Sequence, residues 1–151
     1  MMLDTTDKRI LDFLQHDSDQ SVDVISEAVN LSRNAVWRRI KLLEQAGYIT
    51  KRVALLDPDQ LEVGLTVFIQ IKTSQHTPSW AEDLSRVARM LPHIQSVYRM
   101  SGDLDYLIKA RVRDMKDYDQ LYQQLTQNLH LSDVSASFVM ESIKDTTALP
   151  L

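Results

Sequence analysis

Six of the 17 lysine and arginine residues lie within residues 30–52, a stretch that contains a single acid, Glu44. Six cations and one acid give this stretch a formal charge of +5, whereas the whole chain has a formal net charge of −4. A protein that binds polyanions through bulk charge is basic throughout, so this acidic chain does not fit that class. The pattern indicates one local surface for an anionic partner. Its cations are Arg33, Arg38, Arg39, Lys41, Lys51 and Arg52.

The residues that catalysis or metal binding would require are missing or poorly spaced. The chain has no cysteine, which excludes disulfides, thiolate catalysis and Cys-ligated zinc. The four histidines lie far apart, and none has a partner at the spacing of a familiar metal-binding helix motif. Three glycines are too few and too scattered for a phosphate-binding loop. We therefore predict no catalytic residue, no metal site and no cofactor.

Length and composition indicate a small soluble protein. At 151 residues, the chain can form one domain or two small ones, and its 44% apolar content is enough for a core. No apolar run approaches the roughly 20 residues of a membrane helix, and no leader-like segment opens the sequence. A cytoplasmic location is the resulting expectation.

The first half of the chain predicts three short helices. Asp4 can cap the first helix, which extends to about residue 16, and Ser21 can cap the second. Asn30 and Leu31 then make a tight break, after which Ser32 caps the third helix. Residues 1–50 therefore predict a helix-turn-helix domain, and residues 51–63 a linker strand or wing.

The third helix is amphipathic. On a helical wheel Val36, Ile40 and Leu43 point to one side, whereas Arg38 lies on the opposite, cationic side. A cationic face alone is also typical of a solvated helix, but the preceding helix and tight turn favour DNA binding, because a free helix fits the major groove. Arg39 lies nearer the packed side, so we expect it to pair with an acid of the first two helices.

The second half, residues 64–151, predicts the order strand, helix, strand, strand, helix, strand. Alternating residues mark the strands, Pro78 and Asp114 mark the helix starts, and a turn around Gly102 joins the middle strands. This order is the ferredoxin-like βαββαβ arrangement, so the fold class is α+β, with helices on one face of an antiparallel sheet. We expect apolar alternate residues on the helix-free face and therefore a dimer.

Four motifs are distributed over nearly the whole chain: Leu3-Asp4-x-x-Asp7-x-x-Ile10-Leu11, Leu31-Ser32, Arg39-Ile40-x-x-Leu43-Glu44-x-x-Gly47-x-Ile49 and Gly102-x-x-Asp105-Tyr106. Together they resemble the Lrp/AsnC family of amino-acid-responsive regulators. "VALLDP" at residues 53–58 and "SASFVMESIKDTTALP" at residues 135–150 are similar to the DecR branch of that family, which responds to L-cysteine.

The resemblance implies a regulator that binds a double-stranded DNA operator, forms a homodimer that assembles into an octamer, and binds a free amino acid near the glycine hairpin. Ser135 replaces the larger amide of asparagine-responsive members, which favours a small ligand such as L-cysteine. The implied DNA contacts are Ser32, Arg33, Asn34, Trp37, Arg38 and Lys41. The implied effector contacts are Met100, Gly102, Asp103, Leu104, Asp105, Ser135 and Ser137.

One alternative from another class stays open at this point. A ferredoxin-like sandwich hosts many functions, so the protein could be a small-molecule enzyme or a transport-linked binding protein with the helical domain as a docking module. A cationic outer helix face is dispensable to an enzyme, and no constellation of nucleophile, base and orienting group is present. These two features favour the regulator.

Overall fold

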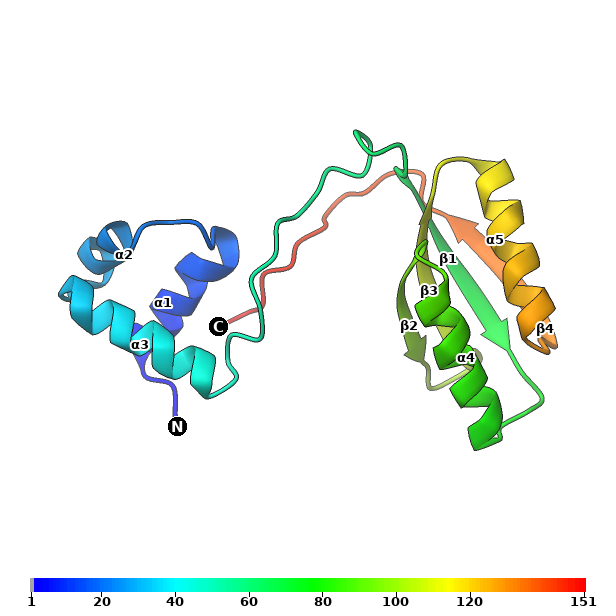
Figure 1. Cartoon of the computed structure of the whole chain (residues 1–151), viewed down its shortest axis with the longest axis horizontal. Coiled ribbons are helices and arrows are strands. Elements are labelled where there is room, and N and C mark those ends of the chain that lie inside the picture. Colours follow the sequence, from blue (N-terminus) through cyan, green and yellow to red (C-terminus); the bar gives the residue numbers. More distant parts are fainter. Residues whose placement is uncertain (1) are drawn as a thin grey trace. The chain divides into compact units, whose positions relative to one another are not determined.

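The structure, a computed structural model that describes residues 2–151, consists of two compact units (Figure 1). The first unit extends to Leu55 and also includes Ile143–Leu151, and the second unit is Leu56–Ser142. The sequence placed residues 64–151 in one domain, whereas the structure groups the last nine of these residues with the helical unit. None of the described helices is long and apolar enough to cross a membrane.

The N-terminal unit contains the three helices that the sequence predicts. They are α1 (Thr5–His16), α2 (Val22–Val29) and α3 (Arg33–Gln45). Asp4, Ser21 and Ser32 each accept a backbone N–H bond at the start of one helix. Asn30 ends α2 in a left-handed conformation, with φ at 54°, which lets the chain reverse direction before α3. The helix-turn-helix prediction is confirmed.

One buried cluster holds these helices together, because each of them is apolar on a single face. Helix α3 contributes the residues that the wheel assigned to packing, and its other face is left for solvent. The buried residues are Ile10, Leu14, Ile25, Val29, Val36, Ile40 and Leu43.

The segment after α3 differs from the sequence-based expectation. Gly47, with φ at +79°, lets the chain leave the helix, but residues 50–57 form no regular secondary structure. Residues 51–63, predicted as a linker strand or wing, therefore form a linker to which no regular strand is assigned. A two-stranded hairpin needs packing on one face, and Val53, Leu55 and Leu56 instead remain exposed.

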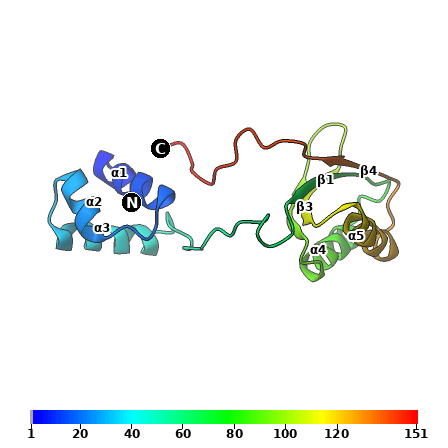
Figure 2. The same cartoon turned by 90° about the horizontal axis from the view of Figure 1, so that it is seen from above.

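The C-terminal unit has the predicted ferredoxin-like order. Its four strands form one antiparallel sheet in the order β2-β3-β1-β4, and Figure 2 shows both helices on the same face of that sheet. The elements are β1 (Leu65–Lys72), α4 (Pro78–Met90), β2 (Ile94–Arg99), β3 (Tyr106–Val112), α5 (Met115–Asn128) and β4 (Asp133–Phe138).

The two faces of the sheet have different compositions. The helix-covered face is apolar, with Ile69 of β1 beside Ile108 of β3 and both fully buried. On the helix-free face, Phe68 has Lys109 and Ser137 as its cross-strand neighbours. The prediction of an apolar helix-free face is thus only partly correct, because polar and charged side chains surround its large apolar groups.

Candidate DNA interface and effector region

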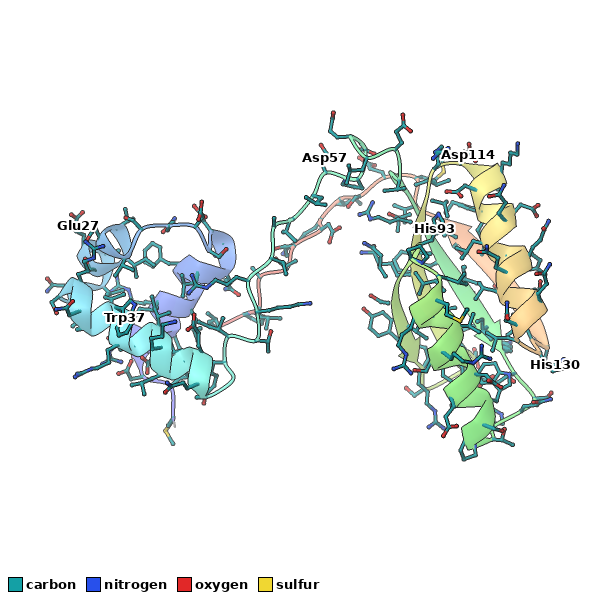
Figure 3. The ribbon with its side chains drawn as sticks, in the orientation of Figure 1. Glu27, Trp37, Asp57, His93, Asp114 and His130 are labelled. Atoms are coloured by element: carbon teal, nitrogen blue, oxygen red, sulfur yellow. The ribbon has the colours of Figure 1, made fainter. Side chains whose placement is uncertain are left out.

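The outer face of α3 exposes a cation and an aromatic ring next to each other. Trp37 has 56% of its surface exposed on α3 (Figure 3). Arg38 is also exposed, and among the described residues it has no hydrogen-bond or ion-pair partner. An unpaired guanidinium can form two parallel hydrogen bonds with a guanine edge or with a phosphate.

The other cations of this face pair with acids that are exposed or partly exposed. Arg33 lies 3.5 Å from Asp23, and Lys41 lies 2.8 Å from Glu44. Lys41 and, less strongly, the nearby Arg52 hold the pKa of Glu44 below its usual range. Exposed ion pairs contribute little to stability, so a DNA phosphate can replace these acids at small cost.

Ser32 and Asn34 have different positions at the start of α3. The Ser32 hydroxyl accepts the Ala35 N–H at 3.3 Å, so its first role is to cap the helix. Asn34 is exposed on the first turn. All six residues assigned to DNA contact therefore lie at or near the exposed face of one helix.

Arg39 has a structural role, as its position on the wheel suggested. Its Nη1 donates to Asp4 at 2.7 Å and to Asp7 at 2.6 Å. Asp7 is buried and, with Asp4, also forms the reciprocal capping box of α1. The Asp7 backbone N–H and the Arg39 guanidinium lower the pKa of Asp4, and the two carboxylates raise the pKa of Arg39. These bonds fix α3 to the start of α1.

The glycine hairpin has the geometry that its sequence predicts. Gly102 has φ at +108°, a conformation that favours glycine, and the Met100 N–H donates to the Asp105 carbonyl at 2.9 Å. Asp103 is exposed at the tip, whereas Leu104 is only partly exposed. The tip therefore presents backbone groups and one free-standing carboxylate to solvent.

Asp105 joins the hairpin to the end of β1. Its carboxylate accepts the Thr73 N–H at 2.8 Å, and its own N–H donates to the Ile71 carbonyl at 3.1 Å. Thr73 is buried, so removal of this carboxylate would leave a buried donor without its partner. Asp105 therefore has a structural role in addition to any contact with a ligand.

The two serines assigned to the effector lie on a different part of the sheet. Ser135 pairs with Gln70 and Ser137 with Phe68, so both lie on the helix-free face of β4. In the sheet order, β1 and β3 separate β4 from β2. Within one chain the structure does not bring these serines together with the hairpin turn.

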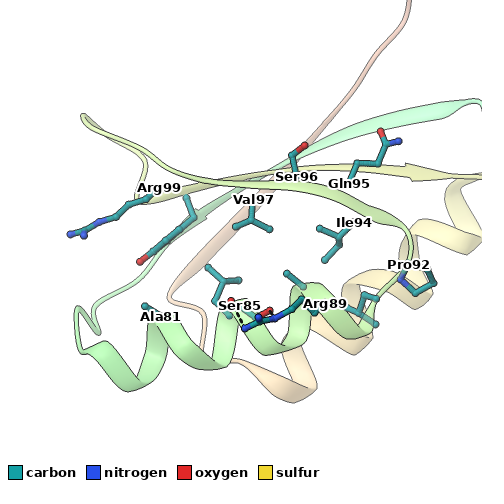
Figure 4. A pocket seen from close by; sticks show the side chains of 13 residues that line it. Ala81, Ser85, Arg89, Pro92, Ile94, Gln95, Ser96, Val97 and Arg99 are labelled. Carbon is teal, nitrogen blue, oxygen red and sulfur yellow. Dashed lines mark hydrogen bonds between the residues drawn. The ribbon is translucent and has the colours of Figure 1, made fainter. Parts of the chain in front are cut away.

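Sequence reasoning missed a cavity of about 590 Å³ between α4 and β2 (Figure 4). Ile94 and Val97 point into this cavity, and Arg99 extends away from them at the end of β2. Arg99 and Tyr106 line the cavity and directly flank the hairpin turn. Arg99 has no ion-pair partner among residues 2–151. The alternation of side chains along β2 could have indicated which of them face the helices. The cavity itself depends on how α4 packs against β2, which the sequence pattern does not encode.

A helix-turn-helix with a free cationic face, joined to a ferredoxin-like domain, defines the class of DNA-binding transcriptional regulators. Two family models match the chain: "Winged helix-turn-helix DNA-binding" over residues 3–50 and "Lrp/AsnC ligand binding domain" over residues 66–149. The chain belongs to the Lrp/AsnC family.

The sequences of known regulators match this chain over almost its full length. A glutamate uptake regulatory protein of Zymomonas mobilis is 44% identical over 99% of this chain and 91% of its own length. The DNA-binding transcriptional activator DecR of Escherichia coli is 43% identical over 99% of both chains. These regulators place the protein among DNA-binding transcriptional regulators and not among enzymes, which closes the alternative left open by the sequence.

Two solved structures have the same fold. An AsnC family transcriptional regulator from Agrobacterium tumefaciens is 42% identical, with a TM-score of 0.94 over 98% of this chain and 97% of its own. A transcriptional regulator from Neisseria meningitidis, solved as a complex with L-Met, is 34% identical, with a TM-score of 0.93 over 99% of this chain and 97% of its own. The protein is thus a transcriptional regulator with a DNA-binding domain and a ligand-binding domain of the Lrp/AsnC type.

Proposed function

We propose that the protein acts in the cytoplasm as a homodimer, and in larger assemblies as an octamer, whose α3 helices bind a roughly palindromic operator. The exposed and unpaired guanidinium of Arg38 is the observation that carries the assignment of α3. Two-fold symmetry of the protein matches two half-sites that are one or more helical turns apart.

Dimer formation through the helix-free face of the sheet has support from its composition. Phe68, Leu107 and Tyr98 lie on this face, and Tyr98 is 52% exposed in the single chain. A second copy would remove these groups from water. Sedimentation of the DNA-free and ligand-free protein at micromolar concentration tests this, and a monomer there would contradict it.

We further propose that the effector is a small free amino acid, with L-cysteine as the first candidate. The resemblance to the DecR branch suggests cysteine, and the Neisseria relative bound to L-Met shows that a family member with this fold takes another sulfur-containing amino acid. The hairpin tip offers Asp103 for the ammonium group, and Arg99 offers a guanidinium for the carboxylate. The cavity beside Arg99, with Ile94 and Val97 among its lining residues, offers space for a side chain.

Calorimetric titration with cysteine, methionine, serine, asparagine and leucine tests this proposal. We expect cysteine to bind most tightly and Arg99→Met to weaken it by about 1.5 to 3 kcal/mol, as for a hydrogen bond to a charged group. Arg89→Met is the matched control, because Arg89 lines the same cavity but donates to Ser85 on its own helix. If the protein binds DNA but none of these amino acids, the effector proposal is contradicted and the DNA-binding proposal is not.

Selection of bound fragments from genomic DNA, with and without these amino acids, would identify the operator and the effector together. The proposal requires enrichment of a sequence with approximate two-fold symmetry. It also requires that one amino acid changes the occupancy of that sequence. Uniform recovery of genomic fragments would show that binding is electrostatic only.

A further inference from the structure

The C-terminal segment, Ile143–Leu151, belongs to the helical unit, and the Gln15 side chain of α1 bonds the backbone of Leu149 within it. The Leu149 N–H donates to Gln15 Oε1 at 2.8 Å, and Gln15 Nε2 donates to the Leu149 carbonyl at 3.1 Å. The primary amide of Gln15 thus satisfies both polar groups of one peptide residue, as an adjacent β-strand would. Gln15 Nε2 also donates to Asp12 at 3.0 Å, which orients the amide.

A hollow lined by both apolar and polar residues lies beside this contact, within the same unit. It has a volume of about 590 Å³, and Leu11, Leu14 and Ile49 contribute to its walls from the helical side. Leu149 and Leu151 contribute from the segment. Leu149 remains 71% exposed, so its backbone, more than its side chain, makes the contact with α1.

We propose that the end of α1 and the chain after α3 form a docking surface for the protein's own C-terminal segment. The two hydrogen bonds between Gln15 and Leu149 identify the segment that occupies this surface. Because both bonds go to the backbone of one residue, they fix which part of the segment lies against α1. The DNA-binding unit is then built from both ends of the chain. It is connected to the ligand-binding unit twice, after Leu55 and before Ile143.

The docked segment begins five residues after the end of the edge strand β4, which carries Ser135 and Ser137. The polypeptide between β4 and Leu149 is therefore a second covalent connection between the units, in addition to residues 51–63.

Cross-linking tests the proposal, because the chain has no native cysteine. His16 and Thr147 both line the hollow, and neither makes the bonds between Gln15 and Leu149. In the full-length double variant His16→Cys/Thr147→Cys, a short flexible bis-maleimide should join the two cysteines within one chain. Denaturing gels and mass spectrometry separate this product from a cross-linked pair of chains.

Adding Gln15→Ala should reduce the yield of the intrachain product about tenfold, as expected for the loss of two hydrogen bonds. Alanine keeps α1 helical, so this variant should fold. Gln120→Ala, at an exposed glutamine on α5, is the matched control and should leave the yield unchanged. No cross-link, a cross-link only between two chains, or a yield insensitive to Gln15→Ala would each overturn the proposal.

Discussion

The N-terminal unit carries its candidate DNA contacts on a single helix, whereas the C-terminal unit distributes its candidate effector contacts over a turn and a separate edge strand. Helix α3 is capped by Ser32, and Arg39 bonds it to the start of α1. Strand β1 lies between the β2–β3 hairpin and the β4 serines. The helix therefore presents all of its candidate DNA contacts from one chain, whereas the two sets of candidate effector contacts do not lie together within one chain.

The largest expected effect tests whether the two units are energetically separate. Ile69 is fully buried under the C-terminal helices, so Ile69→Ala should lower the free energy of unfolding of that unit by about 2 to 5 kcal/mol. The N-terminal helices should keep their own transition. Differential scanning calorimetry, with amide exchange to assign each transition, measures this, and an equal loss of protection in both units would contradict the division.

A second prediction separates the two carboxylates of the hairpin. Asp105→Ala should destabilise the C-terminal unit by about 1 to 3 kcal/mol, because it leaves the buried Thr73 N–H without an acceptor. Asp103→Ala should leave stability unchanged and lower amino-acid affinity. Chemical denaturation and calorimetric titration of both variants check this prediction. Equal losses of stability in the two variants would contradict the structural role assigned to Asp105.

The smallest effect concerns pH and the N-terminal unit. The pKa of Asp4 and that of Glu44 are lowered in the folded state, so each carboxylate favours folding when ionised. This contribution is present above the ordinary carboxyl pKa of about 4 and is lost as the pH falls through the lower folded value. The melting temperature of the N-terminal unit should fall slightly between pH 5 and pH 3, and Asp4→Asn should reduce that slope. An unchanged slope would contradict the assignment.

Local rules predicted most of the fold. Caps such as Ser32, the alternation of β1 and the Gly102 turn depend on near neighbours in sequence, and each agrees with the structure. The docking of Leu149 on Gln15 joins residues 134 positions apart, and no periodicity encodes such a contact. The cavity beside Arg99 likewise depends on how α4 packs against β2.

The central claim, that the outer face of α3 reads DNA, is tested most directly by two adjacent arginines. Arg38→Ala and Arg39→Ala remove the same side chain from two positions of one helix that are about 100° apart, the outer face and the edge that packs on α1. Binding of each variant to the selected operator should be measured at one fixed salt concentration. Arg38→Ala should weaken specific binding by about 1 to 3 kcal/mol with unchanged stability, whereas Arg39→Ala should lower the melting temperature more than the discrimination between operator and random DNA. Equal loss of discrimination from both substitutions, in stably folded protein, would contradict the account.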